Sequence, residues 1–175
     1  MLPYPGFGEQ KTAHLDIVSA PGLISWQHSA RKHNPMSLRE VALKYNIHFK
    51  KALGQNLLLD DNINRIMVDA AALTDEDCVI EVGAGLGALT KRMQPKAGRI
   101  LAVEIDTSFM PCLEDQFRDA SNVVLFRGDI LNHEPEKLAE EFIPGGARYK
   151  VVANLPYYIT SPILFHFWES SLPLE

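Results

Sequence analysis

The hydrophobic residues of this chain change their spacing along its length. From Cys78 onward, short runs of consecutive apolar residues alternate with stretches in which apolar residues recur every three to four positions. Runs of four to eight apolar residues are typical of strands buried on both faces, and the longer spacing is typical of helices that bury one face. Strands are therefore expected over residues 78–82, 99–105, 123–126 and 149–154.

Helices are expected after each of these strands. They lie over residues 86–93, from Thr107, over 136–142, and from a cap at Thr160 or Ser161 that places Pro162 in the first turn. Short apolar strands that alternate with helices predict a parallel sheet with right-handed crossovers. We therefore assign the chain to the α/β class, as a Rossmann-like parallel sheet with flanking helices.

Two further helices are expected before the first strand. In residues 37–45, one helical face carries Leu38, Val41, Ala42 and Tyr45. Asp60 or Asp61 can cap the next helix, in which the residues that recur at helical spacing are Ile63, Ile66, Met67, Ala70 and Leu73. Each set is typical of a helix that buries one apolar face.

Residues 1–35 follow neither pattern. They hold four of the eleven prolines and three glycines, with no clear period. We interpret residues 1–35 as an irregular N-terminal extension and Met36 as the natural start of the domain at 36–175.

Composition narrows the class of protein. A chain of 175 residues with 46% hydrophobic and 22% charged residues can build one domain, or a domain and part of another. Cys78 and Cys112 lie 34 positions apart with no Cys-x-x-Cys motif, so a disulfide framework and a structural zinc site are not expected. No apolar run approaches the roughly 20 residues of a membrane helix, and no secretion signal opens the chain. We expect a soluble, cytoplasmic monomer that binds no metal.

Charge is distributed unevenly. The net charge is −5, but residues 28–51 carry six Lys and Arg side chains against Glu40 alone, which gives this segment +5 and the remainder −10. Such a segment suits an anionic polymer, and Lys50 and Lys51 are candidates for contacts with RNA phosphates. A solvated helix face with a charged tail explains the same pattern.

The loops after the first two predicted strands favour a nucleoside cofactor. Glycines at 83, 85 and 87 follow the first strand, and such a turn lets a ligand approach the backbone. Glu104 ends the second strand, 21 residues beyond Gly83, where a carboxylate can accept both ribose hydroxyls. This pair fits nicotinamide, flavin and S-adenosylmethionine (SAM) enzymes alike.

Asp129, after the third strand, can accept a hydrogen bond from an adenine amine, but Asp is also a common turn residue.

The fourth strand ends in Asn154-Leu155-Pro156-Tyr157, which favours methylation of an adenine amine. The lone pair of that amine is delocalised into the ring, which makes the nitrogen a poor nucleophile. Hydrogen-bond acceptors for both amine hydrogens favour the pyramidal, nucleophilic form of the nitrogen. The Asn154 side chain and a backbone carbonyl at Leu155 or Pro156 are the candidate acceptors, while Tyr157 offers a face for the extracted base. Because Asn is not a general base, its role is positioning and electrostatics.

Five ordered motifs carry a resemblance to a known family. They are Lys50–Asp60, Glu81–Thr90, Val103–Asp106, Gly128–Asp129 and Asn154–Pro162. Together they resemble the ribosomal RNA adenine N6,N6-dimethyltransferases, most of all the bacterial branch that acts on small-subunit rRNA. The resemblance runs from about Ser37 to Leu174.

The resemblance implies an activity and a set of contacts. The family transfers methyl groups from SAM to two adjacent adenosines and dimethylates each. By position, its cofactor contacts correspond to Asn56, Leu58, Gly83, Glu104, Asp129 and Asn154. Its target-adenine motif corresponds to Asn154–Tyr157. Implied partners are ribosomal RNA and the precursor of the small ribosomal subunit.

The chain departs from the family pattern in three places. Leu57 stands where the family usually has Phe, and residues 1–35 match nothing in the pattern. The chain reaches Glu175 where the family begins the fifth of its seven strands, so the C-terminal strands and the small helical domain are expected to be absent.

Other functions remain open. They are a large-subunit rRNA adenine methylase, a non-catalytic assembly factor that binds RNA or SAM, and a nicotinamide oxidoreductase. The last leaves Asn154–Tyr157 without a role.

Overall fold

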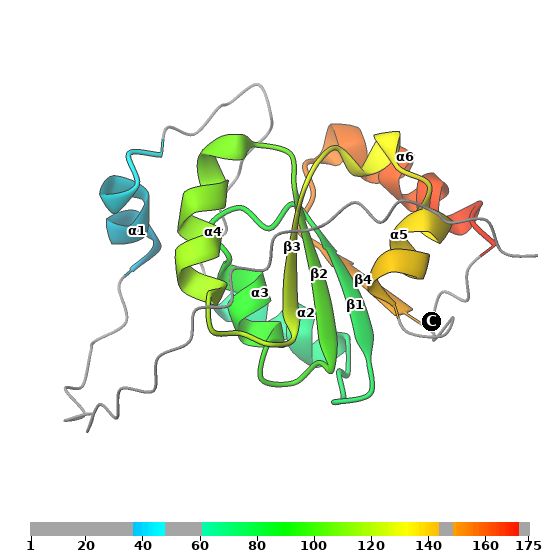
Figure 1. Cartoon of the computed structure of the whole chain (residues 1–175), viewed down its shortest axis with the longest axis horizontal. Helices are drawn as coiled ribbons and strands as arrows, with labels where there is room; N and C mark the ends of the chain where they lie inside the picture. Colours follow the sequence, from blue (N-terminus) through cyan, green and yellow to red (C-terminus); the bar gives the residue numbers. More distant parts are fainter. Residues whose placement is uncertain (1–36, 48–60, 144–148, 172–175) are drawn as a thin grey trace, which may run out of the picture. The chain divides into compact units, whose positions relative to one another are not determined.

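A computed structural model describes residues 37–47, 61–143 and 149–171. In this part of the chain the strands form one parallel sheet in the order β3-β2-β1-β4 (Figure 1). The strands are β1 (Cys78–Val82), β2 (Arg99–Glu104), β3 (Val123–Arg127) and β4 (Tyr149–Ala153). All the predicted strands are confirmed, with ends that differ by at most one residue. The predicted extension at 1–35, including a start at Met36, lies outside the described residues.

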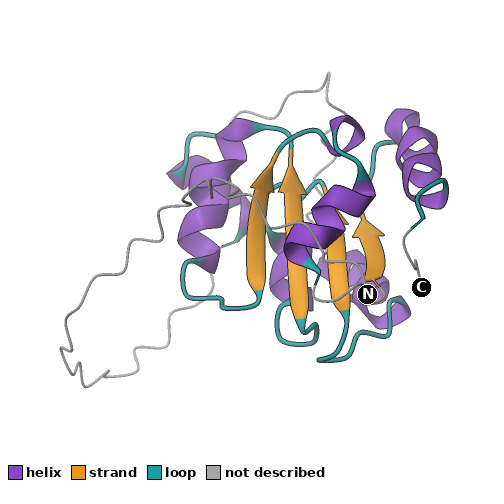
Figure 2. Ribbon diagram, turned by 45° about the vertical axis from the view of Figure 1, so that its right-hand side comes forward, coloured by secondary structure: helices purple, strands orange, loops and turns teal. Residues whose placement is uncertain are grey.

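Helices cover both faces of the sheet (Figure 2). Neighbouring residues of a strand point to opposite faces, so Val79 and Ile80 on β1 enter different cores. Val79 packs in the core that includes Leu89 of α3 (Ala88–Met93) and Leu113 of α4 (Met110–Phe117). Ile80 packs in the core of α5 (Pro135–Phe142) and α6 (Tyr157–Trp168). Because β1 and β2 are buried on both faces, they show as mostly apolar runs, in which Glu81 is the charged residue inside β1.

The first helix, α1 (Leu38–Lys44), begins as its sequence predicts. Ser37 and Glu40 form a capping box, in which the Glu40 carboxylate accepts the Ser37 N–H at 2.7 Å. Val41 and Ala42 are buried, which confirms that part of the predicted face.

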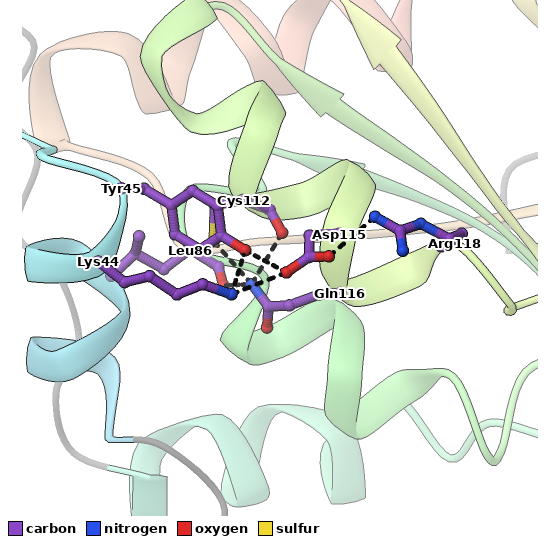
Figure 3. A network of polar contacts seen from close by, with 7 residues as sticks. All are labelled: Lys44, Tyr45, Leu86, Cys112, Asp115, Gln116 and Arg118. Carbon is purple, nitrogen blue, oxygen red and sulfur yellow. Dashed lines mark hydrogen bonds and ion pairs between the residues drawn. The ribbon is translucent and has the colours of Figure 1, made fainter.

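Polar contacts also hold the end of α1 against α4. The Asp115 carboxylate of α4 accepts hydrogen bonds from Lys44 Nζ at 2.9 Å and from the Tyr45 hydroxyl (Figure 3). Arg118 donates to the other oxygen of this carboxylate at 2.9 Å. The Lys44 and Asp115 side chains are half exposed, so these contacts orient α1 more than they stabilise it.

The predicted face of α2 (Asp61–Ala70) is wrong in part. Asn64 and Val68 are the buried residues, whereas Ile63 and Ile66 are exposed. Met67 and Leu73 pack at the edge of the core as predicted. The helix turns Asn64 inward because that face closes one side of the cavity described below.

The last helix begins earlier than its sequence predicts. Pro156, with φ −61° and ψ 142°, is the residue before α6, so neither Thr160 nor Ser161 is the cap. The Thr160 hydroxyl instead bonds back to the Pro156 carbonyl at 3.0 Å, as Ser and Thr do inside helices. Pro162 therefore lies in the helix interior rather than in the first turn.

The 86–93 helix begins at Ala88, and the helix expected from Thr107 opens with one 3₁₀ turn, η2 (Thr107–Phe109), before α4. Among the described residues no helix is long and apolar enough to cross a membrane.

Candidate functional site

A cavity of about 780 Å³ lies at the carboxyl ends of the strands. Loops after all of the described strands line it, as expected where ligands bind in open parallel sheets. Its polar and flexible lining includes the predicted residues Gly83, Glu104, Asp129 and Asn154, together with Leu155, Pro156 and Tyr157. The structure thus brings these residues together around one space. Asn56, Leu58, Lys50 and Lys51 lie outside the described residues.

The glycine turn after β1 forms one wall of this cavity. Gly83, Gly85 and Gly87 all have positive φ, at 82°, 55° and 76°, a conformation that side chains rarely adopt. A Cβ on Gly87 would come within 2.8 Å of the Phe117 ring, so Gly87 also allows α3 to pack on α4. A Cβ on Gly83 would meet no atom within 4 Å. The backbone at Gly83 therefore leaves space for a ligand.

Glu104 ends β2 with its carboxylate fixed by backbone donors. Its Oε2 accepts the Gly85 N–H at 2.7 Å, and its Oε1 accepts the Asp106 N–H at 2.8 Å. Burial raises the pKa of Glu104, although these hydrogen bonds act in the opposite direction. The Ile105 backbone is a further donor, and since a carboxylate has about four acceptor positions, Glu104 can still accept a ligand hydroxyl.

Asp129 has the turn role considered for it and also lies at the cavity. It caps the 3₁₀ turn η3 (Ile130–Asn132) by accepting the Leu131 N–H at 3.0 Å, which is the ordinary structural role. It also lines the cavity. Asp129 is therefore held in place by the turn that it caps.

Asn154 and Tyr157 flank the turn that leads from β4 into α6. Both are exposed, and the Tyr157 side chain is fully open to solvent at the cavity. The Pro156 carbonyl between them accepts from both Ile159 N–H, at 3.1 Å, and the Thr160 hydroxyl. The turn thus presents a polar and an aromatic side chain on a backbone that the start of α6 holds.

Glu81 is a cavity residue that the sequence reasoning did not select. It lies within β1, is 1% exposed, and accepts the Thr90 hydroxyl at 2.5 Å. Burial raises the pKa of Glu81 to about 8, against the hydrogen bonds from Thr90. A charged residue inside an otherwise apolar strand was the signal in the sequence.

The described lining of the cavity is acidic. Its acidic residues are Glu81, Glu104 and Asp129, and it holds no Lys, Arg or His. In the described ranges, no group of three or more His, Cys, Asp or Glu side chains is arranged to hold a metal ion. The cavity therefore offers acceptors and negative charge to a ligand.

Similarity to curated proteins is high over most of the chain. The protein named ribosomal RNA small subunit methyltransferase A from Alkaliphilus oremlandii is 42% identical over 145 residues, which is 83% of this chain and 50% of that protein. The protein of the same name from Pelotomaculum thermopropionicum is 45% identical over 136 residues, 75% of this chain and 46% of that protein. The chain spans about half the length of these relatives.

Solved structures and a family model agree with this similarity. A 23S rRNA methyltransferase, ErmE, superposes with a TM-score of 0.56 at 26% identity, over 66% of this chain and 43% of that one. A dimethyladenosine transferase from Plasmodium falciparum superposes with a TM-score of 0.51 at 25% identity, over 65% and 38%. The fold is thus the Rossmann-like fold of rRNA methyltransferases. Since the model of the ribosomal RNA adenine dimethylases matches residues 46–175, the chain belongs to that family.

Proposed function

We propose that the chain forms the catalytic part of an enzyme that methylates the N6 amine of adenosines in small-subunit ribosomal RNA. In this proposal the enzyme dimethylates two adjacent adenosines. The observation that carries this proposal is the cavity at the carboxyl ends of the strands, where the glycine turn, Glu104 and Asp129 face Asn154–Tyr157. The names of the relatives support the choice of substrate.

SAM, the cofactor that family membership implies, fits this cavity. Its volume lies within the roughly 300–1,000 Å³ usual for small-ligand sites. Glu104 would accept the ribose hydroxyls, and Asp129 the adenine amine. When bound, SAM supplies the methyl group. The acidic lining suits a cationic nucleoside and disfavours the anionic diphosphate of a nicotinamide dinucleotide. Asn56 and Leu58 remain predicted contacts.

The target adenine would enter beside Asn154. The Asn154 side-chain oxygen accepts one hydrogen of its amine in this proposal. Because the Pro156 carbonyl already accepts two hydrogen bonds, the Leu155 carbonyl is the better candidate for the second hydrogen. Tyr157, exposed at the cavity, provides a stacking face for the extracted base.

The partners follow from the same proposal. Lys50 and Lys51 would contact RNA phosphates, and an rRNA substrate favours a cytoplasmic location. A monomer stays a prediction. The similarity to ErmE keeps the large-subunit rRNA methylase as a second candidate, but its 26% identity is well below the 42–45% of the small-subunit relatives.

Calorimetric titration of the chain with SAM and with NAD tests the cofactor. We expect binding of SAM only. Glu104→Ala removes the ribose acceptor, and since hydrogen bonds to charged groups contribute about 1.5–3 kcal/mol, SAM affinity should fall at least about tenfold. Glu114→Ala, which removes an exposed acid of α4, is the matched control and should bind as the parent does. An unchanged affinity in folded Glu104→Ala protein would refute the ribose assignment.

Methyl incorporation tests the substrate. A version extended to the length of the relatives is incubated with labelled SAM and either naked small-subunit rRNA, small ribosomal subunits, or large-subunit rRNA. Labelling of small-subunit adenosines supports the proposal. Labelling of large-subunit rRNA alone supports the second candidate, and SAM binding without any labelling supports a non-catalytic assembly factor.

A further inference from the structure

Glu81 is a buried acid in the centre of the sheet that also borders the cavity. β1 pairs with β2 on one side and with β4 on the other, so Glu81 is shielded by strands along both edges. Its carboxyl is held by the hydroxyl of Thr90, itself 0% exposed, at 2.5 Å. The function proposed above gives a role to Glu104 but none to Glu81.

Among the described residues, the groups around Glu81 provide no positive charge. α3 faces it with Thr90, α2 borders the same cavity with Asn64, and β2 contributes Glu104, whose charge repels it. The remaining titratable side chains in the described lining are Asp129, Tyr157 and Tyr158. Burial of this kind disfavours the ionised form of a carboxyl, and the pKa of Glu81 rises to about 8. In the ligand-free chain the carboxyl is therefore protonated at neutral pH.

We propose that entry of a cationic ligand into the cavity ionises Glu81, so that each binding event releases one proton from this carboxyl to solvent. A positive charge near the carboxyl favours its ionised form, and the Thr90 hydroxyl then stabilises the carboxylate by its hydrogen bond. Glu81 is thus a positioning residue that selects ligands by charge. The inference rests on the proposed function in so far as the cation is that of SAM.

The coupling has a defined sign. Below the pKa of Glu81, binding must displace a proton, so affinity rises with pH, by about tenfold from roughly pH 6 to pH 7. Two cations of SAM are candidates, the sulfonium and the ammonium of its amino-acid end. S-adenosylhomocysteine keeps only the ammonium. A steep pH dependence for SAM alone assigns the effect to the sulfonium, and the same dependence for both ligands assigns it to the ammonium.

Calorimetry on the 175-residue chain measures the released proton directly. SAM is titrated near pH 7 in buffers of different ionisation enthalpy, and the slope of the observed enthalpy gives the protons released. We expect close to one proton for the parent and none for Glu81→Gln, a neutral side chain of the same shape. Thr90→Val removes the hydroxyl that stabilises the carboxylate, so it should move the rise in affinity to higher pH.

A second measurement follows the Glu81 carboxyl itself, first without a ligand and then with SAM. The ¹³C signal of the Glu81 carboxyl should titrate far above the usual Glu range in the ligand-free chain, and should show the ionised form at neutral pH once SAM is added. The Glu81→Gln variant keeps Glu104. If it releases no proton when SAM binds, Glu104 is not the source of the proton.

The outcomes separate the two proposals. A parent chain that binds SAM without proton release, or a Glu81→Gln variant that still releases one proton, overturns the coupling and leaves the proposed function standing. A parent that binds no SAM at any pH overturns the proposed function, and the coupling with it.

Discussion

The acids at the two ends of the parallel sheet have pKa values that are shifted in opposite directions. At the amino end, Asp77 lies 3.1 Å from Lys150 Nζ and accepts the Thr74 N–H at 2.6 Å. Burial raises the pKa of Asp77, but these hydrogen bonds outweigh it, so the pKa is lowered. At the carboxyl end, Glu81 and Glu104 border the cavity and both have raised pKa values.

The two acids differ in whether the protein itself supplies a cation. Lys150 and Thr74 provide the Asp77 carboxylate with a cation and with hydrogen-bond donors. The folded protein therefore stabilises the ionised form of Asp77 without a ligand. Glu81 accepts hydrogen bonds from the Thr90 side chain and backbone, and it has no cation among the described lining residues. A buried acid without a cation costs stability, and it is kept where a ligand brings the missing charge. We therefore expect the acids at the carboxyl end of the sheet to lower stability in the absence of the proposed cationic ligand.

The largest effect expected from this comparison is on catalysis. Asn154→Ala, in a chain extended to the length of the relatives, should lower the rate of methyl transfer by about 10²–10³, by analogy with loss of one preorganised hydrogen bond. Because Asn154 is exposed, the melting temperature should barely change. Single-turnover methylation with saturating SAM measures the chemical step. Tyr157→Phe is the control and should be mild, since it keeps the ring; an inactive Tyr157→Phe beside a normal Asn154→Ala would reverse the assigned roles.

The next effect concerns pH and stability. The pKa of Glu81 is raised from 4.5 to about 8 on folding, so the folded chain holds a proton that the unfolded chain loses. Its contribution to stability is complete below pH 4.5 and is lost as the pH rises toward 8, by up to about 1.4 kcal/mol per pH unit. Glu81→Gln should therefore melt progressively higher than the parent from about pH 5 to pH 7. If the difference in melting temperature between parent and variant is the same at every pH from about 5 to 7, the pKa of Glu81 is not raised.

The smallest effect is expected at the amino end. Lys150→Met keeps the aliphatic stem but leaves the Asp77 carboxylate without its cation, and should cost about 1–2 kcal/mol of stability in urea unfolding. The estimate is modest because both side chains are partly exposed and Thr74 still donates. SAM affinity should stay unchanged, and a large loss of affinity would contradict the separation of the two ends. Lys137→Met, which breaks an exposed pair with Glu134, is the matched control.

β1 and β2 were predictable because burial on both faces leaves mostly apolar runs, and β3 and β4 because their residues are also largely apolar. The buried face of α2 was not, since periodicity gives the spacing of apolar residues and not the neighbour that a helix meets. Ile63 and Ile66 fit the spacing, but docking beside the cavity turns Asn64 inward. The start of α6 was missed because Pro156 precedes the helix without a side-chain cap, whereas Thr160 has the residue type of a cap.

The site was partly predictable for a related reason. Gly83, Glu104, Asp129 and Asn154 each lie at the end of a strand or just after it, and parallel strands bring their carboxyl ends to one edge. Glu81 lies within a strand, and only the packed structure shows that its carboxyl borders the cavity. The raised pKa depends on neighbours far apart in sequence, which no local pattern contains.

The strand order also has a consequence for how the chain folds. Cys78 pairs with Arg99, 21 residues away, and Ile100 with Val123, 23 residues away, but Cys78 pairs with Tyr149 across 71 residues. Closing the longer loop costs more entropy, so β4 should join the sheet last. Pulse-labelled hydrogen exchange during refolding should protect the amides of β1 and β2 before those of β4, and simultaneous protection would refute this order. The nucleoside-binding half of the cavity would then form first, and the wall that carries Asn154 would complete it.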